Sequence, residues 1–408
     1  MPRLRWLMIS FAFLATVINY LDRQTLSVAA PVLREEFAMS AGDYSRVVFA
    51  FLLAYTILNG VSGALLDRLG TRVGYAICMA WWSAAAALHT LATGAWSLGA
   101  FRFLLGMGEA GNWPAAVKVV AEWFPERERA LASGIFNSGS AVGAILAPPL
   151  VAWLILQFGW RTSFLAVAVL GFLWLAAWWP VYRSPGLTQP ESRAAASGTS
   201  FSLLDLFRTR FVWSFTLSKV FIDPVWYFYI FWFPEYLKTA RGFDMASIGR
   251  YAWIPFAVAG LGNLIGGWLS GWLIGLGLPV MNARRTAVTI FALLVTSAIP
   301  AVLVTNMRVA MGLVSLAMLG YTGASASMLA MPADVFPKNA VASVYGLASM
   351  GSGFGGMLFT LLTGWAVDHF SYTPVFIGFG ILPLICAATL WALLSASTSP
   401  EGDRPTLL

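Results

Sequence analysis

Charged side chains are scarce in this sequence, and their scarcity indicates the class of protein. Only 11% of the 408 residues are Asp, Glu, Lys or Arg, while 59% are hydrophobic. Soluble domains have about 25% charged and about 45–50% apolar residues, so this composition excludes an ordinary soluble protein. Apolar stretches long enough to cross a hydrocarbon core, about 20 residues each, recur along the whole chain. We therefore expect an all-α integral membrane protein with little chain outside its spans.

Cysteine and histidine are also scarce, with two of each in the chain. Cys78 and Cys386 lie in apolar stretches, so the sequence predicts neither a disulfide framework nor a cysteine metal site. His89 and His369 have no cluster of metal ligands beside them. The chain also lacks a Ser/His or Cys/His pattern that would support chemistry. We therefore expect no enzyme activity, no metal and no cofactor.

Charged or Gly/Pro-rich turns divide the chain into twelve predicted helices. The longest polar stretch, residues 183–210, separates the sixth helix from the seventh. The sequence therefore predicts an N-terminal six-helix bundle at 1–182, a cytoplasmic linker at 183–210 and a C-terminal six-helix bundle at 211–408. The predicted spans are 6–33, 43–66, 73–92, 95–123, 128–156, 161–182, 211–238, 246–275, 285–305, 307–332, 340–366 and 373–396.

The basic residues of the loops predict the orientation of the chain. Most of them fall on the side of the two termini, among them Arg3, Arg68, Arg127 and Arg285. Cytoplasmic loops of membrane proteins carry an excess of Lys and Arg, so we expect both termini in the cytoplasm. The net charge of +7 then reflects membrane topology, and it requires no nucleic-acid partner.

Charged residues inside the predicted spans are the first candidates for a functional site. Asp22 and Arg23 are adjacent in the first helix, in the stretch INYLDRQTL, and Arg102 and Glu109 lie seven residues apart in the fourth. Seven residues are about two helical turns, so Arg102 and Glu109 share one helix face. A charge at the centre of a bilayer costs about 2.5–3.5 kcal/mol, so such residues usually face a cavity and have partners. The alternative is a buried ion-pair network that only fixes helix packing.

The seventh predicted helix carries a second group of polar residues. Lys219 and Asp223 are four residues apart, the spacing of an ion pair on one helix face. Trp226 and Tyr227 follow on the same face. The aromatic residues nearer the end of this helix are expected in the belt at the membrane interface. These are Trp232, Phe233 and Tyr236.

Glycine is concentrated in the fifth, eighth and eleventh predicted helices, in stretches such as SGIFNSGSAVGAILAPP. Small residues at this density predict close approach between neighbouring helices. Asn137 lies in the first of these stretches, where it could bond either a neighbouring helix or a ligand.

The stretch GALLDRLGTR, residues 63–72, follows the second predicted helix. It resembles the G-x-x-x-D-R-x-G-x-R signature of the major facilitator superfamily, and Arg102 matches an intramembrane arginine in the fourth helix of that superfamily. The resemblance implies twelve transmembrane helices in two six-helix halves, alternating access, and a conformational role for the motif. The signature positions are Gly63, Asp67, Arg68, Gly70 and Arg72.

Longer stretches resemble one branch of that superfamily. NYLDRQTLSVAAP and FRFLLGMGEAGNWPAAVKVVAEWF are similar to the anion:cation symporter family, and DPVWYFYIFWFPEYL resembles its hexuronate transporters. The resemblance implies proton-coupled uptake of a sugar-acid anion through a bacterial inner membrane. By the same resemblance the proton-linked carboxyls are Asp22 and Glu109, the substrate-side arginines are Arg23 and Arg102, and a second-helix tyrosine is Tyr55.

The side chains expected around the substrate narrow its chemistry. Arg23, Arg102 and Lys219 are cationic, and Asp223 is expected to neutralise Lys219, which leaves a surplus for one carboxylate. We therefore expect a hexuronate such as glucuronate or galacturonate, bound with a proton by a monomer in the lipid bilayer. The alternatives are an aldonate or aldarate, another organic anion, and an uncoupled facilitator or exchanger of the same fold. The groups suited to a hydroxylated ring are Tyr55, Asn137, Trp226 and Tyr227.

Overall fold

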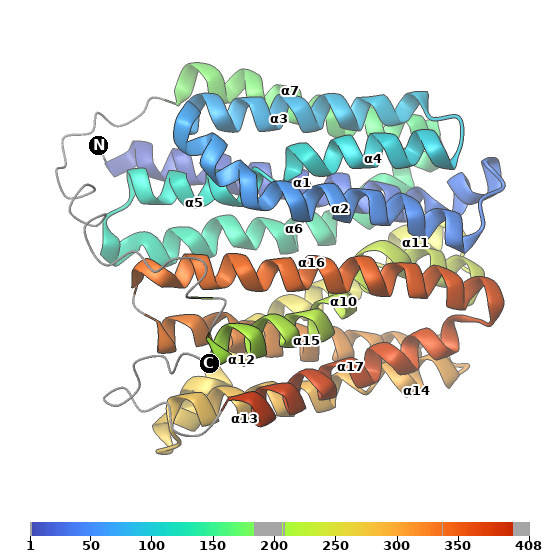
Figure 1. The fold of residues 1–408 in the computed structure, drawn as a ribbon. Coiled ribbons are helices and arrows are strands. Elements are labelled where there is room, and N and C mark those ends of the chain that lie inside the picture. Colours follow the sequence, from blue (N-terminus) through green and yellow to red (C-terminus); the bar gives the residue numbers. More distant parts are fainter. Residues whose placement is uncertain (1, 183–205, 207–208, 337, 395–408) are drawn as a thin grey trace. The chain divides into compact units, whose positions relative to one another are not determined.

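The computed structural model describes residues 2–182, 206, 209–336 and 338–394. The predicted cytoplasmic linker, residues 183–210, therefore lies almost entirely outside the described residues. Helices make up the described elements, and each predicted span has a helical counterpart (Figure 1).

In chain order the elements are α1 (Pro2–Glu36), α2 (Ala41–Leu69), α3 (Thr71–Leu88), the short 3₁₀ turn η1 (His89–Leu91), α4 (Ala95–Glu109), α5 (Asn112–Trp123), α6 (Glu126–Phe158), α7 (Trp160–Val181), α10 (Arg210–Thr239), α11 (Met245–Tyr251), α12 (Ile254–Gly275), α13 (Val280–Val295), α14 (Ala298–Leu303), α15 (Met307–Val335), α16 (Lys338–His369) and α17 (Tyr372–Leu393). Three predicted spans are broken into two helices each: the fourth (α4 and α5), the eighth (α11 and α12) and the ninth (α13 and α14).

Nine segments of the described chain are long and apolar enough to cross a membrane. The predicted third, fourth and seventh spans are helical too, but they are not among these nine. For the fourth span the break after Glu109 explains this, because it leaves pieces of only 15 and 12 residues. Large apolar side chains such as Leu173 and Trp268 are exposed, as expected for helices whose neighbours are lipid tails. The all-helical membrane architecture predicted from composition is confirmed.

The chain divides into two compact units. Unit 1 contains Met1–Leu187, Phe228–Trp253 and Thr360–His369; unit 2 contains Thr188–Tyr227, Ile254–Phe359 and Phe370–Leu408. Residues 228–253 and 360–369 lie in the second half of the sequence but belong to unit 1. Those two segments, the end of α10 with α11 and the end of α16, pack with the first half of the chain.

Glycines allow the helices of unit 1 to approach closely around the buried charges. In α6, a Cβ atom on Gly143 would lie 2.7 Å from the carbonyl oxygen of Val17 in α1. In α4, a Cβ atom on Gly106 would lie 2.5 Å from the carbonyl oxygen of Phe51 in α2. No side chain fits in these gaps, so α1 packs directly on α6 and α2 on α4.

Unit 2 is packed in the same way. A Cβ atom on Gly355 of α16 would lie 2.3 Å from the carbonyl oxygen of Val220 in α10. A Cβ atom on Gly266 of α12 would lie 2.3 Å from the carbonyl oxygen of Gly323 in α15. The close helix approach predicted from the glycine-rich stretches is therefore confirmed in both units.

The aromatic residues near the end of α10 do not form an interfacial belt. Trp232, Phe233 and Tyr236 are each at most 1% exposed. Tyr44 of α2 meets Trp232 edge to face, with ring centroids 5.0 Å apart. The prediction of a belt was wrong because this part of α10 belongs to unit 1, where its aromatic side chains are covered by protein.

Candidate functional site

Charged residues of the first and fourth predicted spans come together in unit 1. Asp22 and Arg23 of α1 and Arg102 and Glu109 of α4 are each at most 4% exposed. Arg23 Nε donates to Glu109 Oε2 over 2.7 Å, which forms a buried ion pair between α1 and α4. Glu109 is thus paired with an arginine of another helix. Arg102, on the same helix as Glu109, lies about 10 Å away from it along the helix axis.

Arg102 has few partners for its charge. Its Nη2 atom donates to the backbone carbonyl oxygen of Asp22 over 3.3 Å. Its Nε and Nη1 atoms are buried and have no hydrogen-bond partner among the described residues, and the same holds for both carboxylate oxygens of Asp22. A buried polar group without a partner costs about 1–3 kcal/mol, and a charged one costs more. The Arg102 guanidinium and the Asp22 carboxyl group therefore both keep hydrogen-bonding capacity that the described chain does not use.

Aromatic rings surround the guanidinium of Arg23. The ring of Tyr55 lies 4.4 Å from its central carbon, and the rings of Tyr20 and Phe51 each lie 5.3 Å from it. Tyr55 and Phe51 of α2 are stacked, with centroids 5.7 Å apart. Such cation–π contacts stabilise a desolvated cation. The predicted site residue Tyr55 is therefore in this cluster. Tyr20 and Phe51 were not predicted, although Tyr20 is three residues before Arg23 on the same helix face.

Asn137 is the predicted unit 1 residue that stays outside this cluster. Its side chain is exposed on α6. Its backbone carbonyl oxygen accepts a hydrogen bond from Ser140 Oγ over 2.7 Å.

The second predicted group forms a buried charge pair in unit 2. Lys219 Nζ lies 3.0 Å from Asp223 Oδ1 and 2.7 Å from Oδ2, as the i,i+4 spacing predicts. Tyr321 of α15 also donates to Asp223 Oδ1, over 3.1 Å.

Aromatic residues lie beside this pair. Trp226 stacks on Tyr321 with centroids 5.6 Å apart and planes at 15°. Tyr227 Oη lies 3.4 Å from the Ser352 hydroxyl. Tyr321 was missed in the sequence because nothing near it in the chain is charged.

The loop motif forms a tight junction between α2 and α3. Gly70 has a φ of 76°, a backbone conformation that favours glycine. Arg72 Nη2 donates to the carbonyl oxygen of Trp179 over 2.7 Å, and Trp178 Nε1 donates to the carbonyl oxygen of Arg72 over 3.0 Å. One motif residue, Arg72, therefore binds the junction to the end of α7 through two hydrogen bonds.

Two other motif residues, Gly63 and Arg68, lie in open surroundings. A Cβ atom on Gly63 would meet nothing within 4 Å, and Arg68 is exposed. Asp67 lies in α2, but its side chain is outside the described part of the structure. Lys118 Nζ donates to the carbonyl oxygen of Leu66 over 2.8 Å, close to the end of α2.

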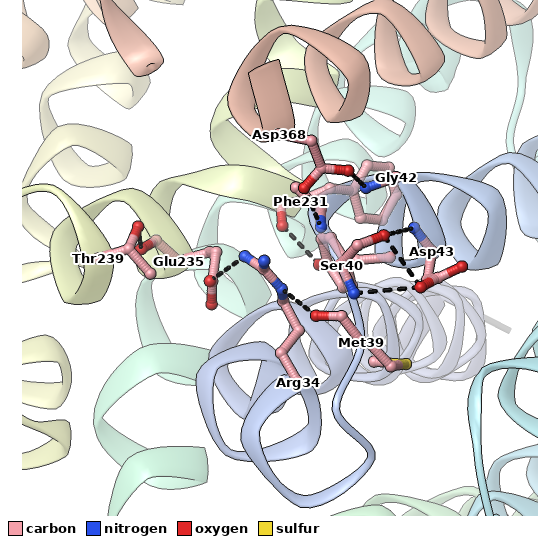
Figure 2. Close-up of polar contacts among 11 residues, drawn as sticks. Arg34, Met39, Ser40, Gly42, Asp43, Phe231, Glu235, Thr239 and Asp368 are labelled. Carbon is pink, nitrogen blue, oxygen red and sulfur yellow. Dashed lines mark hydrogen bonds and ion pairs between the residues drawn. The ribbon is translucent and has the colours of Figure 1, made fainter. Parts of the chain in front are cut away.

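The N-terminus of α2 contacts α16, and the C-terminal end of α1 contacts α10 (Figure 2). Arg34 of α1 forms an ion pair with Glu235 of α10. Asp368 of α16 accepts hydrogen bonds from the backbone N–H groups of Ala41, over 2.7 Å, and Gly42, over 2.6 Å. A carboxylate at a helix N-terminus is stabilised by unpaired N–H groups and by the helix dipole. These contacts join residues 201 or more positions apart in the chain, and no local sequence pattern predicts them.

A groove of about 330 Å³ lies on α2 and α4. Asp43, Arg46, Trp96 and Phe103 are among its lining residues, and no predicted site residue lines it. In the described chain, no group of three or more His, Cys, Asp or Glu residues is arranged to hold a metal ion.

Comparison with known proteins identifies the family. The model of the Major Facilitator Superfamily matches residues 12–320 and 280–407. The hexuronate transporter of Escherichia coli (strain K12) is 33% identical over 422 residues, which cover 99% of this chain and 97% of that protein. The galacturonate transporter of Dickeya chrysanthemi is 36% identical over 280 residues, covering 65% of this chain and 81% of that protein. The D-galactonate transporter of Escherichia coli O6:H1 is 28% identical over 409 residues, 94% of each chain.

Solved structures show the same fold at lower sequence identity. A bacterial homologue of the human lysosomal transporter Spinster superposes with a TM-score of 0.75 at 20% identity, covering 95% of both chains. A D-xylose–proton symporter superposes with a TM-score of 0.76 at 15% identity, covering 95% of this chain and 97% of that one. The helices, the loop motif and these matches agree. The chain is therefore a transporter, not an enzyme, and belongs to the major facilitator superfamily.

Proposed function

We propose that this transporter imports a hexuronate such as glucuronate or galacturonate together with a proton. It acts as a monomer in a bacterial inner membrane, with both termini in the cytoplasm. The observation that supports this most directly is the state of Arg102, which is fully buried and keeps Nε and Nη1 without hydrogen-bond partners in the described chain. A buried cation with free donors is most stable when an anionic ligand supplies the missing acceptors.

A sugar-acid carboxylate is the anion that fits this arginine. The planar fork of a guanidinium binds a carboxylate through two parallel hydrogen bonds. Relatives named as hexuronate, galacturonate and D-galactonate transporters support a sugar acid rather than a simple organic acid. Hydroxyl and aromatic side chains suit the rest of such a molecule, through hydrogen bonds and stacking. The further proposed substrate-binding residues are Arg23, Tyr55 and Asn137 in unit 1 and Lys219, Trp226 and Tyr227 in unit 2.

Asp22 and Glu109 are the proposed proton-binding residues. Both are buried beside the two arginines, and each carries a negative charge only when it is deprotonated. A substrate carboxylate that engages an arginine competes with these carboxylates for positive charge. Anion binding therefore favours protonation, and protonation favours anion binding, which is the reciprocal coupling that a symporter needs.

D-galactonate is the second candidate substrate. It carries a single carboxylate on a six-carbon hydroxylated chain, so its charge is the same as that of a hexuronate. The D-galactonate transporter that covers 94% of this chain supports it as the alternative.

Competition of labelled glucuronate uptake into proteoliposomes tests the substrate. We expect unlabelled glucuronate and galacturonate to inhibit strongly, galactonate to inhibit less, and glucose to inhibit at least about tenfold less, because it lacks a charge-assisted bond of about 1.5–3 kcal/mol. Lactate should also compete poorly, because it leaves the polar groups around a sugar ring without partners. Equal inhibition by glucose, or none by either uronate, would overturn the proposal.

Uptake with and without an imposed proton gradient tests the coupling. A symporter accumulates glucuronate above the outside concentration only when the gradient is present. A facilitator or exchanger equilibrates labelled substrate at the same rate whether or not a gradient is imposed. If uptake is the same with and without the gradient, the substrate proposal is unaffected and the proposal of proton coupling is wrong.

A further inference from the structure

Lys219 already holds a carboxylate that belongs to the protein. Lys219 is 7% exposed and Asp223 is 4% exposed, and the Lys219 ammonium group contacts both carboxylate oxygens of Asp223. The charges of the pair cancel within unit 2. A negatively charged ligand therefore meets Lys219 only by displacing Asp223 or by joining it.

Tyr321 fixes the orientation of this internal carboxylate. Its hydroxyl donates to Asp223 Oδ1, the same oxygen that lies 3.0 Å from Lys219 Nζ. Tyr321 is itself held by the parallel stack with Trp226, and Trp226 meets Phe256 edge to face at 6.0 Å. Asp223 thus has one partner on its own helix and a second on α15. Two partners on different helices make its displacement from Lys219 unfavourable.

We propose that Asp223, positioned by Tyr321, makes the transporter selective for sugar acids with one carboxylate over those with two. The inference rests on the proposed function and concerns the charge of the substrate. The buried ammonium is occupied by an internal anion that is always present and already oriented. A dicarboxylate such as glucarate brings a second negative charge that finds no free cation here, and burying that charge unpaired is unfavourable.

The substitution Asp223→Asn should reverse this selectivity. It keeps the size of the side chain and removes its charge, so Lys219 becomes a buried cation without a carboxylate. A dicarboxylate then supplies the missing anion. We expect the ratio of glucarate affinity to glucuronate affinity to rise by about tenfold or more, the range of one charge-assisted hydrogen bond.

Two further variants separate charge selectivity from general damage. Tyr321→Phe removes one hydrogen bond to Asp223 and leaves Lys219 paired. The ratio of glucarate affinity to glucuronate affinity should therefore rise by only about threefold, because this substitution removes one hydrogen bond and no charge. The double variant Lys219→Gln with Asp223→Asn removes both charges, so the preference for glucuronate should return. Tyr75→Phe is the matched control, because Tyr75 is buried and its hydroxyl donates to Asn112 over 2.7 Å in unit 1. The ratio of glucarate affinity to glucuronate affinity in Tyr75→Phe should equal that of the parent protein.

The affinities are measured twice, by competition of glucuronate uptake and by thermal stabilisation of the purified protein with each acid. An unchanged ratio in Asp223→Asn, or a gain for glucarate that persists in the double variant, overturns the inference. If Asp223→Asn does not fold, an unchanged ratio in Tyr321→Phe overturns it. If the parent neither imports nor binds a uronate, the proposed function fails. A gain in stabilisation by glucarate in Asp223→Asn would then still support charge selection at Lys219.

Discussion

Arg23 and Arg102 are both buried in unit 1, yet their guanidinium groups have different surroundings. Arg23 has an ion pair with Glu109 and lies within 5.3 Å of the rings of Tyr20, Phe51 and Tyr55. Arg102 donates to a single backbone oxygen. Arg23 is therefore held by an acid and by aromatic rings, and one of its buried donors, Nη2, has no hydrogen-bond partner among the described residues. Arg102 has no acid as a partner in the described chain, and two of its buried donors, Nε and Nη1, have no hydrogen-bond partner there.

Arg102→Lys keeps the charge but removes the planar fork. A lysine binds a carboxylate as a point charge and cannot form two parallel hydrogen bonds. We expect glucuronate uptake to fall by about tenfold or more, the effect of losing about 1.4 kcal/mol of binding. Arg46→Lys is the control, because the Arg46 side chain is 75% exposed and pairs with Asp43 at the start of α2. Parental uptake and affinity in Arg102→Lys would show that Arg102 serves packing or general charge.

Gly70→Ala tests the backbone of the loop motif. Gly70 has φ 76° and ψ 158°, a region that side chains disfavour, and a Cβ atom there would meet nothing within 4 Å. The cost is therefore conformational, about 1–3 kcal/mol, and the thermal stability of the purified protein should fall. Gly63→Ala is the matched control, since it lies inside α2 and has equally open space. Alanine favours a helix over glycine, so this variant should be as stable as the parent or more stable. Equal melting temperatures for the two variants would contradict the argument.

At the level of elements, the break in the fourth span determines where Glu109 lies. Pro114 has no N–H group, and its ring clashes with the carbonyl group four residues earlier, that of Ala110. α4 therefore ends at Glu109, and α5 begins at Asn112. A Cβ atom on Gly111 would lie 2.3 Å from the sulfur of Cys78, so the break is packed directly against α3. Glu109 thus sits at a helix end, where Arg23 reaches it.

The contact between α16 and the start of α2 gives a prediction about local stability. Asp368→Asn replaces a charged acceptor at the α2 N-terminus with a neutral one. The interaction with the helix dipole, which contributes about 0.3–1 kcal/mol, should be lost, and the two hydrogen bonds to the backbone should become weaker. Hydrogen–deuterium exchange of a peptide containing Ala41 and Gly42 should become several-fold faster. Asp334→Asn is the control, because Asp334 pairs with Arg284 in unit 2. Exchange that is unchanged in Asp368→Asn would mean that α16 does not hold this helix end.

At the level of the whole molecule, the two buried carboxyls of unit 1 should couple transport to the proton. Asp22→Asn and Glu109→Gln remove a titrating group and keep its shape, so accumulation of glucuronate driven by a proton gradient should be lost in both. Exchange of substrate at equal pH on the two sides does not require proton release, and at least one variant should retain it. Normal gradient-driven accumulation in both variants would remove the coupling role from these residues.

The class of protein, its helices and the charged residues of the candidate site could be predicted from the amino-acid sequence. Hydropathy is a property of each segment, so a chain with 11% charged residues shows its membrane helices without tertiary information. A charge within such a helix stands out for the same reason, as do Asp22, Arg23, Arg102 and Glu109. The Lys219–Asp223 pair was also predictable, because its two members lie on adjacent turns of one helix.

The pairing of residues from different helices depended on the tertiary structure. Arg23 and Glu109 are 86 residues apart, and Tyr321 and Asp223 are 98 apart. Periodicity relates residues within one segment and carries no information on which segments become neighbours. The burial of Trp232, Phe233 and Tyr236 also depended on the tertiary structure. The end of α10 packs within unit 1, and this packing covers their side chains. Hydropathy of the segment alone would place them in lipid or at the membrane interface. Which of the two buried arginines is paired with an acid was likewise a consequence of helix packing, because Glu109 lies at a helix end that only folding brings to Arg23.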